Sequence, residues 1–375
     1  MTGSISDFRR QARAWLEANV PNGPAPTDGP EARAFVLSWQ KRQALGEWAG
    51  IAWPKEVGGR GASVLEQIVW FEEYARARAP SPLDASFVGL NHAGPTLIAC
   101  GSPEQKARHL PRILNGDDIW CQGFSEPGAG SDLASVKTRG RVEGDELIID
   151  GQKIWSSYAD IGDWQELLIC TEPGARTSAA LTWVICPMDA PGITVRPIKT
   201  MAGPRKYCEV FYDGVRIPLS NVVGGLNNGW ATAMSTLAFE RGTASLALMI
   251  GLTQRVEHLL AACPPGRAEM RARLARLRAE GASIRAMAYR FALDCADTVP
   301  DSSGSIVRLS FAEFSQRVSA AALDLYGIDA PEVVRPHGLG YDYLDAFSET
   351  IAGGAAEIQR NIIAERVLGL PKGPR

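Results

Sequence analysis

The sequence lacks the patterns that mark several classes of protein. Its 375 residues include seven cysteines and four histidines, with no CxxC pair and no metal-ligand spacing. These absences argue against a disulfide framework or a metal site and favour the reducing cytoplasm. A net charge of -3 gives no reason to expect nucleic acid or an anionic membrane as a partner.

Long apolar runs are also missing. The longest, residues 244–252, is too short to cross a bilayer. Near the start of the chain, Phe8, Ala12, Trp15 and Leu16 recur at helical spacing and do not form the continuous run of a secretory signal. We therefore expect a soluble protein with no membrane insertion.

The length and the apolar residues that are present predict a protein of two or three domains. A chain of 375 residues exceeds one ordinary core, and its apolar fraction of 45% is typical of globular proteins. Helical periodicity covers residues 1–118, short β-branched and aromatic runs cover 119–222, and helical periodicity returns over 223–375. These three ranges are our predicted domains.

Local signals support this α+β multidomain class. Ser102, Pro103 and Gln105 form a helix-start signal, and the turn dipeptide Asp150-Gly151 favours a hairpin. We expect an N-terminal helical domain, a central β-barrel-like domain and a C-terminal four-helix bundle.

Residues 122–135 form a glycine- and serine-rich segment suited to close contact with a ligand. Gly128 and Gly130 permit unusual backbone angles, while Ser125 and Ser131 offer hydroxyl groups. The segment is not a GxGxxG turn that opens a βαβ unit, since no crossover helix is predicted after it. The usual dinucleotide-binding fold is therefore excluded.

Several separated motifs give the chain a specific resemblance. Residues 123–135 read GFSEPGAGSDLAS and residues 151–157 read GQKIWSS, and further matches occur at 52–59, 228–230 and 357–361. In this order and over nearly the whole chain, they resemble the acyl-CoA dehydrogenase family. That resemblance implies FAD as cofactor and α,β-dehydrogenation of an acyl thioester.

The resemblance also assigns a flavin site. Gln122, Phe124 and Ser125 would line the isoalloxazine, Trp155 would cover it, and Ser157 would hydrogen-bond its N5 edge. Ser131 would lie near the pyrophosphate and the CoA arm. The full predicted cofactor set is Gln122, Phe124, Ser125, Gly130, Ser131, Trp155, Ser156 and Ser157.

The position of the catalytic base departs from the commonest family pattern. Many members carry a glutamate in a C-terminal loop, where this chain has Gly353. A smaller branch carries it in a Glu-Arg pair on the first helix of the bundle, and Glu240-Arg241 matches that position. We therefore predict that Glu240 removes the α-proton while the β-hydrogen leaves as hydride to flavin N5. The predicted substrate contacts are Ser131, Arg241 and Gly353.

Family features that grip FAD across a subunit interface are missing at residues 261–267, at 324–330 and at Ala355. Some bacterial relatives that act on steroid or other bulky acyl groups are mixed assemblies with fewer flavins than chains. The resemblance therefore implies a homo- or hetero-oligomer, such as α2β2, with electron-transfer flavoprotein as electron acceptor.

Two alternatives stay open at the level of sequence. One is a flavin-poor, non-catalytic partner subunit of a heteromeric dehydrogenase. The other is a flavin monooxygenase on the same fold, which needs no base for an α-proton. The acyl chain is not specified, and a carrier-protein thioester could replace the CoA thioester.

Overall fold

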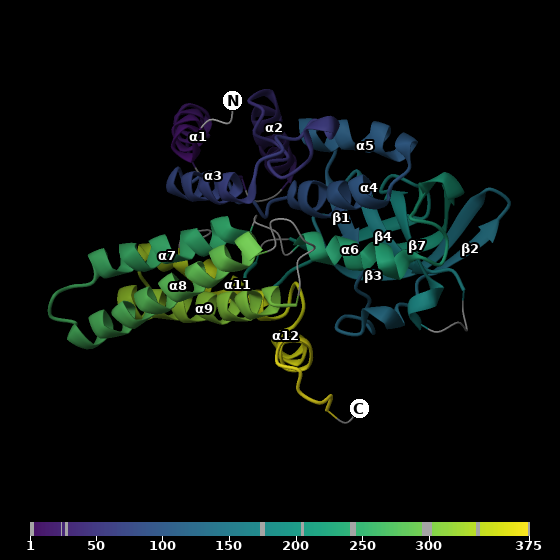
Figure 1. Cartoon of the computed structure of the whole chain (residues 1–375). Helices are drawn as coiled ribbons and strands as arrows, with labels where there is room; N and C mark the ends of the chain where they lie inside the picture. Colours follow the sequence, from purple (N-terminus) through teal and green to yellow (C-terminus); the bar gives the residue numbers. More distant parts are fainter. Residues whose placement is uncertain are drawn as a thin grey trace.

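Three regions follow one another along the chain in the computed structural model (Figure 1). The structure describes residues 4–23, 25–26, 29–172, 177–203, 206–240, 245–294, 302–334 and 338–373, with the side chains of residues 29, 177, 240, 245 and 334 outside this description. None of the helices in these ranges combines the length and the hydropathy that a membrane-spanning segment needs.

The first region is helical and lies across the other two. In Figure 1 its helices form the upper layer, with α1 and α3 above the long C-terminal helices and α4 and α5 beside the sheet. Its elements are α1 (Ile5–Asn19), α2 (Gly29–Leu45), η1 (Lys55–Val57), α3 (Val64–Arg76), the π-helical turn η2 (Gly89–Ala93), α4 (Gly94–Cys100) and α5 (Pro103–Asn115).

Local sequence explains where these helices begin and end. Ser63 and Glu66 form a reciprocal capping box at the start of α3, and Ser102 and Gln105 form another at the start of α5. Gly116 ends α5 in a left-handed conformation that glycine adopts without strain. The helix-start signal predicted at residue 102 is thus found in the structure.

The second region is one mixed sheet with the strand order β6-β7-β3-β2-β4-β5-β8, and β1 pairs with β4. Its inner face carries a core from β3, β4, β5 and β7, centred on Leu147, Leu167, Val184 and Val210. The strands are β1 (Trp120–Gly123), β2 (Arg139–Glu143), β3 (Glu146–Ser157), β4 (Trp164–Cys170), β5 (Leu181–Pro187), β6 (Ile193–Ile198), β7 (Tyr207–Pro218) and β8 (Val222–Val223).

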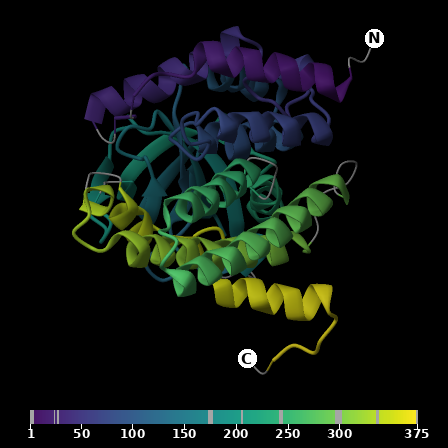
Figure 2. The same ribbon diagram turned by 90° about the vertical axis from the view of Figure 1, so that its left-hand side faces the viewer.

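The third region is helical. Helices α7, α8 and α9 lie side by side, and α11 and α12 pack on α9 (Figures 1 and 2). Helix α6 instead packs on α4 and on β5. The elements are α6 (Gly229–Glu240), α7 (Ser245–Ala262), α8 (Ala268–Asp294), α9 (Gly304–Tyr326), α10 (Pro331–Val334), α11 (Leu339–Asp345), α12 (Ala356–Ile362) and the π-helical turn η7 (Ile363–Val367).

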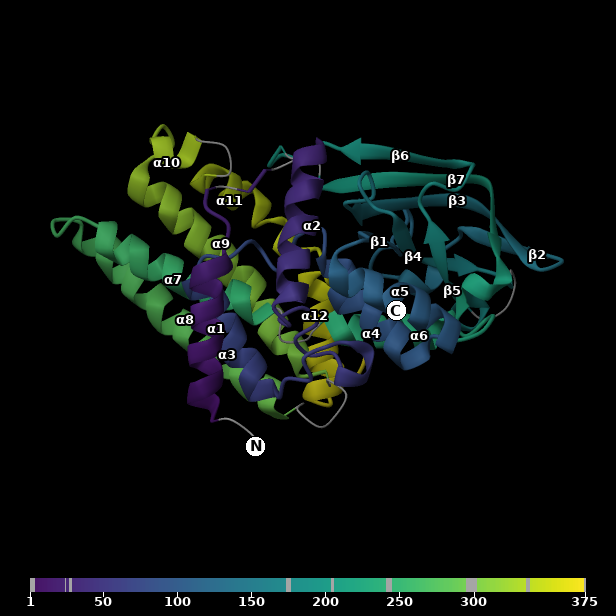
Figure 3. The same cartoon turned by 90° about the horizontal axis from the view of Figure 1, so that it is seen from above.

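The predicted fold class is confirmed, with a helical region, a β region and a second helical region in that order. Figure 3 shows the sheet at one end of the molecule, the long C-terminal helices at the other, and α2 lying between them. Helix α6 packs on the sheet at β5, whereas α7 packs on α3 and on α8. The three regions therefore meet near the middle of the molecule.

Candidate active site

A cavity of about 780 Å³ lies where the three regions meet. The sheet contributes Gln122, Ser125, Trp155 and Ser157 to its wall, and the C-terminal loop contributes Gly353. These residues were predicted as site residues from motifs more than 190 positions apart in the chain. The structure brings them to one cavity.

A buried ion pair joins the two sequence motifs of the sheet. Lys153, in the second motif, donates to the Glu126 carboxylate at 2.8 Å and to the Phe124 carbonyl at 2.9 Å. Glu126 also accepts from the backbone N–H groups of Lys137 at 2.6 Å and Thr138 at 2.9 Å. Burial alone would raise the pKa of Glu126, but the Lys153 charge and these hydrogen bonds lower it. The pair fixes the glycine-rich loop against β3.

An irregularity in β3 turns Trp155 toward the cavity. The pairing of β3 with β7 shifts register between Lys153 and Ser156, and Trp155 adopts a left-handed backbone with φ of 63°. Such a bulge re-aims side chains, and this φ is strained for an aromatic residue. Trp155 is 54% exposed, and its indole meets the Tyr207 ring edge to face with the ring centroids 6.0 Å apart. An exposed tryptophan on a cavity wall offers a face to a flat ligand.

The amide of Gln122 is held from behind by a buried polar pair. Gln122 Nε2 donates to Glu166 Oε1 at 2.8 Å, and His92 Nδ1 lies 3.2 Å from the same oxygen. Glu166 is Gln122's register partner on β4, while His92 comes from η2. Sequence reasoning missed both, because an isolated histidine and a strand glutamate carry no motif signal.

Other predicted residues have different surroundings. The Phe124 side chain is buried in the core between the sheet and the helices, and Ser156 is buried at its strand position. Gly130 and Ser131 lie on an exposed loop outside the cavity wall. Their roles toward a cofactor or substrate remain predictions.

The predicted base lies at the edge of what the structure describes. Glu240 is the last residue of α6, but its side chain and the whole of Arg241 are outside the described residues. The two residues before it, Ala238 and Phe239, line the cavity. The final turn of α6 therefore reaches the cavity that the sheet motifs line.

The rest of the lining comes mainly from helices, forms what we call the helical wall, and is mainly aromatic and aliphatic. It includes Trp39, Trp48, Trp70, Phe71, Tyr74, Phe87, Leu246, Met249, Phe291 and Phe311. Four charged side chains also reach the cavity: Asp84, Lys206, Arg308 and Glu349. None of the four lies in a recognised motif, so the sequence did not identify them.

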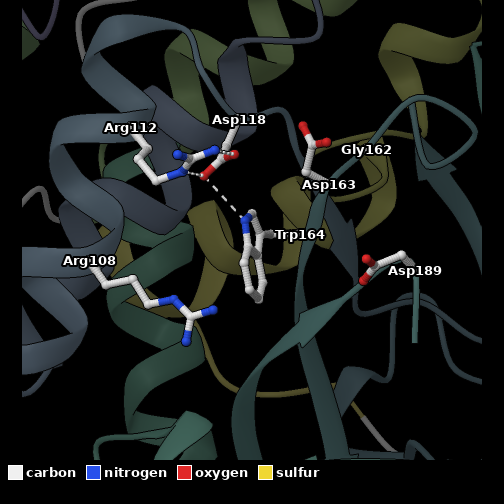
Figure 4. A pocket seen from close by; sticks show the side chains of 7 residues that line it. All are labelled: Arg108, Arg112, Asp118, Gly162, Asp163, Trp164 and Asp189. Atoms are coloured by element: carbon white, nitrogen blue, oxygen red, sulfur yellow. Dashed lines mark hydrogen bonds and ion pairs between the residues drawn. The ribbon is translucent and has the colours of Figure 1, made fainter. Parts of the chain in front are cut away.

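A second cavity, of about 460 Å³, lies beside α5 and β4 (Figure 4). Its charges are mostly paired: Arg112 holds Asp118 at 2.7 Å, and Arg33 holds Asp163 at 2.9 Å. The indole of Trp164 donates to Asp118 at 3.2 Å. This cavity contains no residue predicted for the site, so the cavity between the three regions is the candidate active site.

Comparisons with known proteins identify all three regions. The N-terminal domain of acyl-CoA dehydrogenases matches residues 3–117, the middle domain matches 121–215, and the C-terminal domain matches 227–368. The acyl-CoA dehydrogenase IpdE1 of Mycobacterium tuberculosis is 39% identical over 98% of both chains. A second relative, the acyl-CoA dehydrogenase FadE26 of the same organism, is 30% identical over 100% of this chain and 99% of its own.

Solved structures give the same result. The Tcur3481-Tcur3483 steroid ACAD superposes with a TM-score of 0.87 at 32% identity, covering 100% of this chain and 99% of the other. The ChsE4-ChsE5 complex from Mycobacterium tuberculosis superposes with a TM-score of 0.84 at 29% identity, covering 100% and 99%. The chain therefore belongs to the acyl-CoA dehydrogenase family, whose enzymes are FAD-dependent oxidoreductases.

Proposed function

We propose that this chain catalyses the FAD-dependent α,β-dehydrogenation of an acyl-CoA thioester. The observation that carries the proposal is the single cavity to which the two sheet motifs, the last turn of α6 and the C-terminal loop all contribute. A dehydrogenase of this class needs a flavin surface, a base and an acyl-binding wall around one volume. The sheet residues of the cavity offer the flavin surface, and its helical wall offers the acyl-binding surface. Helix α6, which carries the predicted base, reaches the same cavity.

The residues of the sheet wall fit a flavin. Trp155 presents an open indole face for a flat ring, and the side chains of Ser125 and Ser157 form no hydrogen bond with another described residue. Gln122, with its Nε2 already committed to Glu166, offers Oε1 as an acceptor. Phe124, Gly130, Ser131 and Ser156 complete the proposed FAD set. When bound, FAD supplies a two-electron acceptor that takes the β-hydrogen as hydride at N5.

Glu240 is the base in this proposal. An α-proton of a thioester is weakly acidic, so its removal needs a carboxylate placed against it in a site shielded from water. Gly353 has no side chain for this task although it lies on the cavity wall. Ala238 and Phe239 bring the last turn of α6 to that wall, which supports Glu240 as the group that takes the proton. Arg241 and Ser131 would contact the thioester and its CoA arm.

The substrate class we propose is a bulky acyl group of the steroid kind, carried on CoA. A volume of about 780 Å³ with an aromatic wall has room for a fused-ring acyl group beside the flavin. The Tcur3481-Tcur3483 protein is described as a steroid ACAD, and ChsE4-ChsE5 as a complex. By analogy, we propose a hetero-oligomer in which a partner chain supplies the contacts to FAD that are missing at Ala355. We also propose electron-transfer flavoprotein as the electron acceptor and the cytoplasm as the location.

An anaerobic titration tests this function. The holoprotein, purified alone and with a candidate partner chain, is mixed with a panel of linear, branched and fused-ring acyl-CoAs while the flavin absorbance is followed. Bleaching by fused-ring acyl-CoAs is the expected result. A purified complex with FAD that no acyl-CoA bleaches would support the monooxygenase. A chain that holds no FAD, alone or with a partner, would support the non-catalytic subunit.

A further inference from the structure

Asp84 is a carboxylate on the cavity wall that the proposed reaction does not use. It lies between α3 and η2, and its Oδ1 accepts hydrogen bonds from the backbone N–H of Ser86 at 2.8 Å and from the Ser86 hydroxyl at 2.6 Å. These two bonds orient the side chain and hold one of its oxygens. The second oxygen, Oδ2, forms no hydrogen bond with another described residue, so it is available to a ligand in the cavity.

The charge of Asp84 has no cation beside it among the described residues. The other acidic side chain of the cavity wall, Glu349, forms an ion pair with Arg308 at 2.9 Å. Asp84 forms no such pair, and burial raises its pKa to about 6 although the Ser86 bonds act in the opposite direction. A carboxylate placed in an apolar cavity without a cation lowers the stability of the fold. A carboxylate of this kind on a cavity wall is a candidate for a functional position.

The surroundings of Asp84 include residues of both the aromatic helical wall and the sheet wall of the cavity. Burial is the main cause of the raised pKa of both Tyr74, on the aromatic side, and Tyr158, and the charge of Asp84 raises each of them further. Tyr158 directly follows Ser157, a proposed flavin contact. A ligand that extends from the flavin along the aromatic wall therefore passes Asp84.

We propose that Asp84 is a specificity-determining residue that accepts a hydrogen bond from a hydroxyl group on the acyl part of the thioester. The inference rests on the proposed function. An ionised carboxylate is an acceptor only, so it pairs with an O–H donor and disfavours a carbonyl or a second carboxylate at the same place. O–H···O⁻ bonds are among the stronger hydrogen bonds in proteins. The acyl group would thus carry a hydroxyl in an otherwise apolar frame.

The test compares two fused-ring acyl-CoAs that differ by one ring hydroxyl, on the holoprotein with whatever partner it needs. Wild type should prefer the hydroxylated compound by about tenfold to a hundredfold in kcat/KM, as expected for a hydrogen bond to a charged group. In Asp84→Asn this ratio should fall toward one, while kcat/KM for the deoxy compound changes less than about threefold. Glu349→Gln is the matched control, because Glu349 is already paired with Arg308, and it should keep the wild-type ratio.

Each outcome is decisive. A ratio that stays at the wild-type value in Asp84→Asn would overturn the inference, and so would a wild-type enzyme that prefers the deoxy compound. The wild-type comparison needs no variant, so it remains informative even where Asp84→Asn loses FAD or fails to fold. Failure of the proposed function looks different, because then neither acyl-CoA bleaches the flavin of the wild type.

Discussion

Each wall of the cavity has a buried carboxylate behind it, Glu126 for the sheet wall and Glu73 for the helical wall, and the partners of the two carboxylates differ. Behind the sheet wall, Glu126 is held by Lys153 and by backbone N–H groups from its own loop. Behind the helical wall, Glu73 on α3 is held by the guanidinium groups of Arg9, Arg13 and Arg76 at 2.7–3.0 Å. The first arrangement connects segments of one domain, whereas the second ties α1 to α3.

The difference explains what each wall can tolerate. Lys153 is fully buried, so its removal leaves an uncompensated charge in a dry core. The three arginines around Glu73 are 38–47% exposed, so water solvates them whenever the carboxylate is lost. The sheet wall should therefore be the more sensitive to the loss of a single partner, and the following changes test that comparison.

The largest expected effect on stability is that of Lys153→Met. Glu126 would stay buried without its cation, which costs about 3–5 kcal/mol in the free energy of unfolding. Urea denaturation measures that loss, and FAD content should fall with it because the glycine-rich loop loses its anchor. Lys137→Met is the control, since Lys137 contributes only its backbone N–H to Glu126. Equal losses from the two variants would contradict the account.

Glu73→Gln should have a smaller effect, about 1.5–3 kcal/mol for lost hydrogen bonds to a charged group. Although burial opposes it, the three arginines lower the pKa of Glu73 from 4.5 to about 2. A group whose pKa is lower in the folded state than in the unfolded state stabilises the fold at pH values above the unfolded pKa. This stability is lost as the pH falls from about 4.5 toward 2.

The pH series separates charge from packing. Wild type should lose stability more steeply than Glu73→Gln over that acidic range, when the free energy of unfolding is measured in buffers of constant ionic strength. Glu17→Gln serves as control, because Glu17 is exposed and, among the described residues, its ion pair is with Arg76. Parallel pH curves for wild type and Glu73→Gln would show that the arginine cluster does not hold an ionised Glu73.

The smallest expected effect on stability, with the opposite sign, is that of Trp155→Gly. Glycine removes the strain of the left-handed backbone at φ of 63°, so the free energy of unfolding should rise by up to about 1 kcal/mol. FAD should bind about tenfold more weakly, since stacking on an aromatic side chain contributes on the order of 1 kcal/mol. Reconstitution of apoprotein with FAD, followed by fluorescence, measures this. Unchanged FAD affinity would remove Trp155 from the flavin site.

The same contrast marks how far the sequence could go. Glu126 and Lys153 both fall inside recognisable motifs, and Gln122, Ser125, Trp155 and Ser157, which were predicted from the same motifs, line the cavity. The sheet order could not be predicted, because β1 pairs with β4 in parallel and its four residues give no periodic signal.

The residues that hold the helical wall in place could not be predicted from the sequence, for a different physical reason. Arg9 and Arg13 meet Glu73 from more than 59 positions away, and His92 meets Glu166 from 74 positions away. Asp84 lies in a loop whose composition looks like an ordinary connection. Tertiary packing brings these side chains to their partners, and no local sequence pattern indicates such contacts.

The central claim is that Glu240 removes the α-proton in this cavity, and a single-turnover experiment tests it most directly. Holoprotein is mixed anaerobically with an acyl-CoA that bleaches the wild-type flavin, and the rate of bleaching is compared with that of Glu240→Gln. The account predicts bound, oxidised flavin in the variant and bleaching slowed by about 10²–10⁴-fold, the usual contribution of a general base. Partial recovery of bleaching in Glu240→Gln/Gly353→Glu would show that a carboxylate at position 353, where many family members carry the base, can replace Glu240. Bleaching of Glu240→Gln at the wild-type rate would contradict the account.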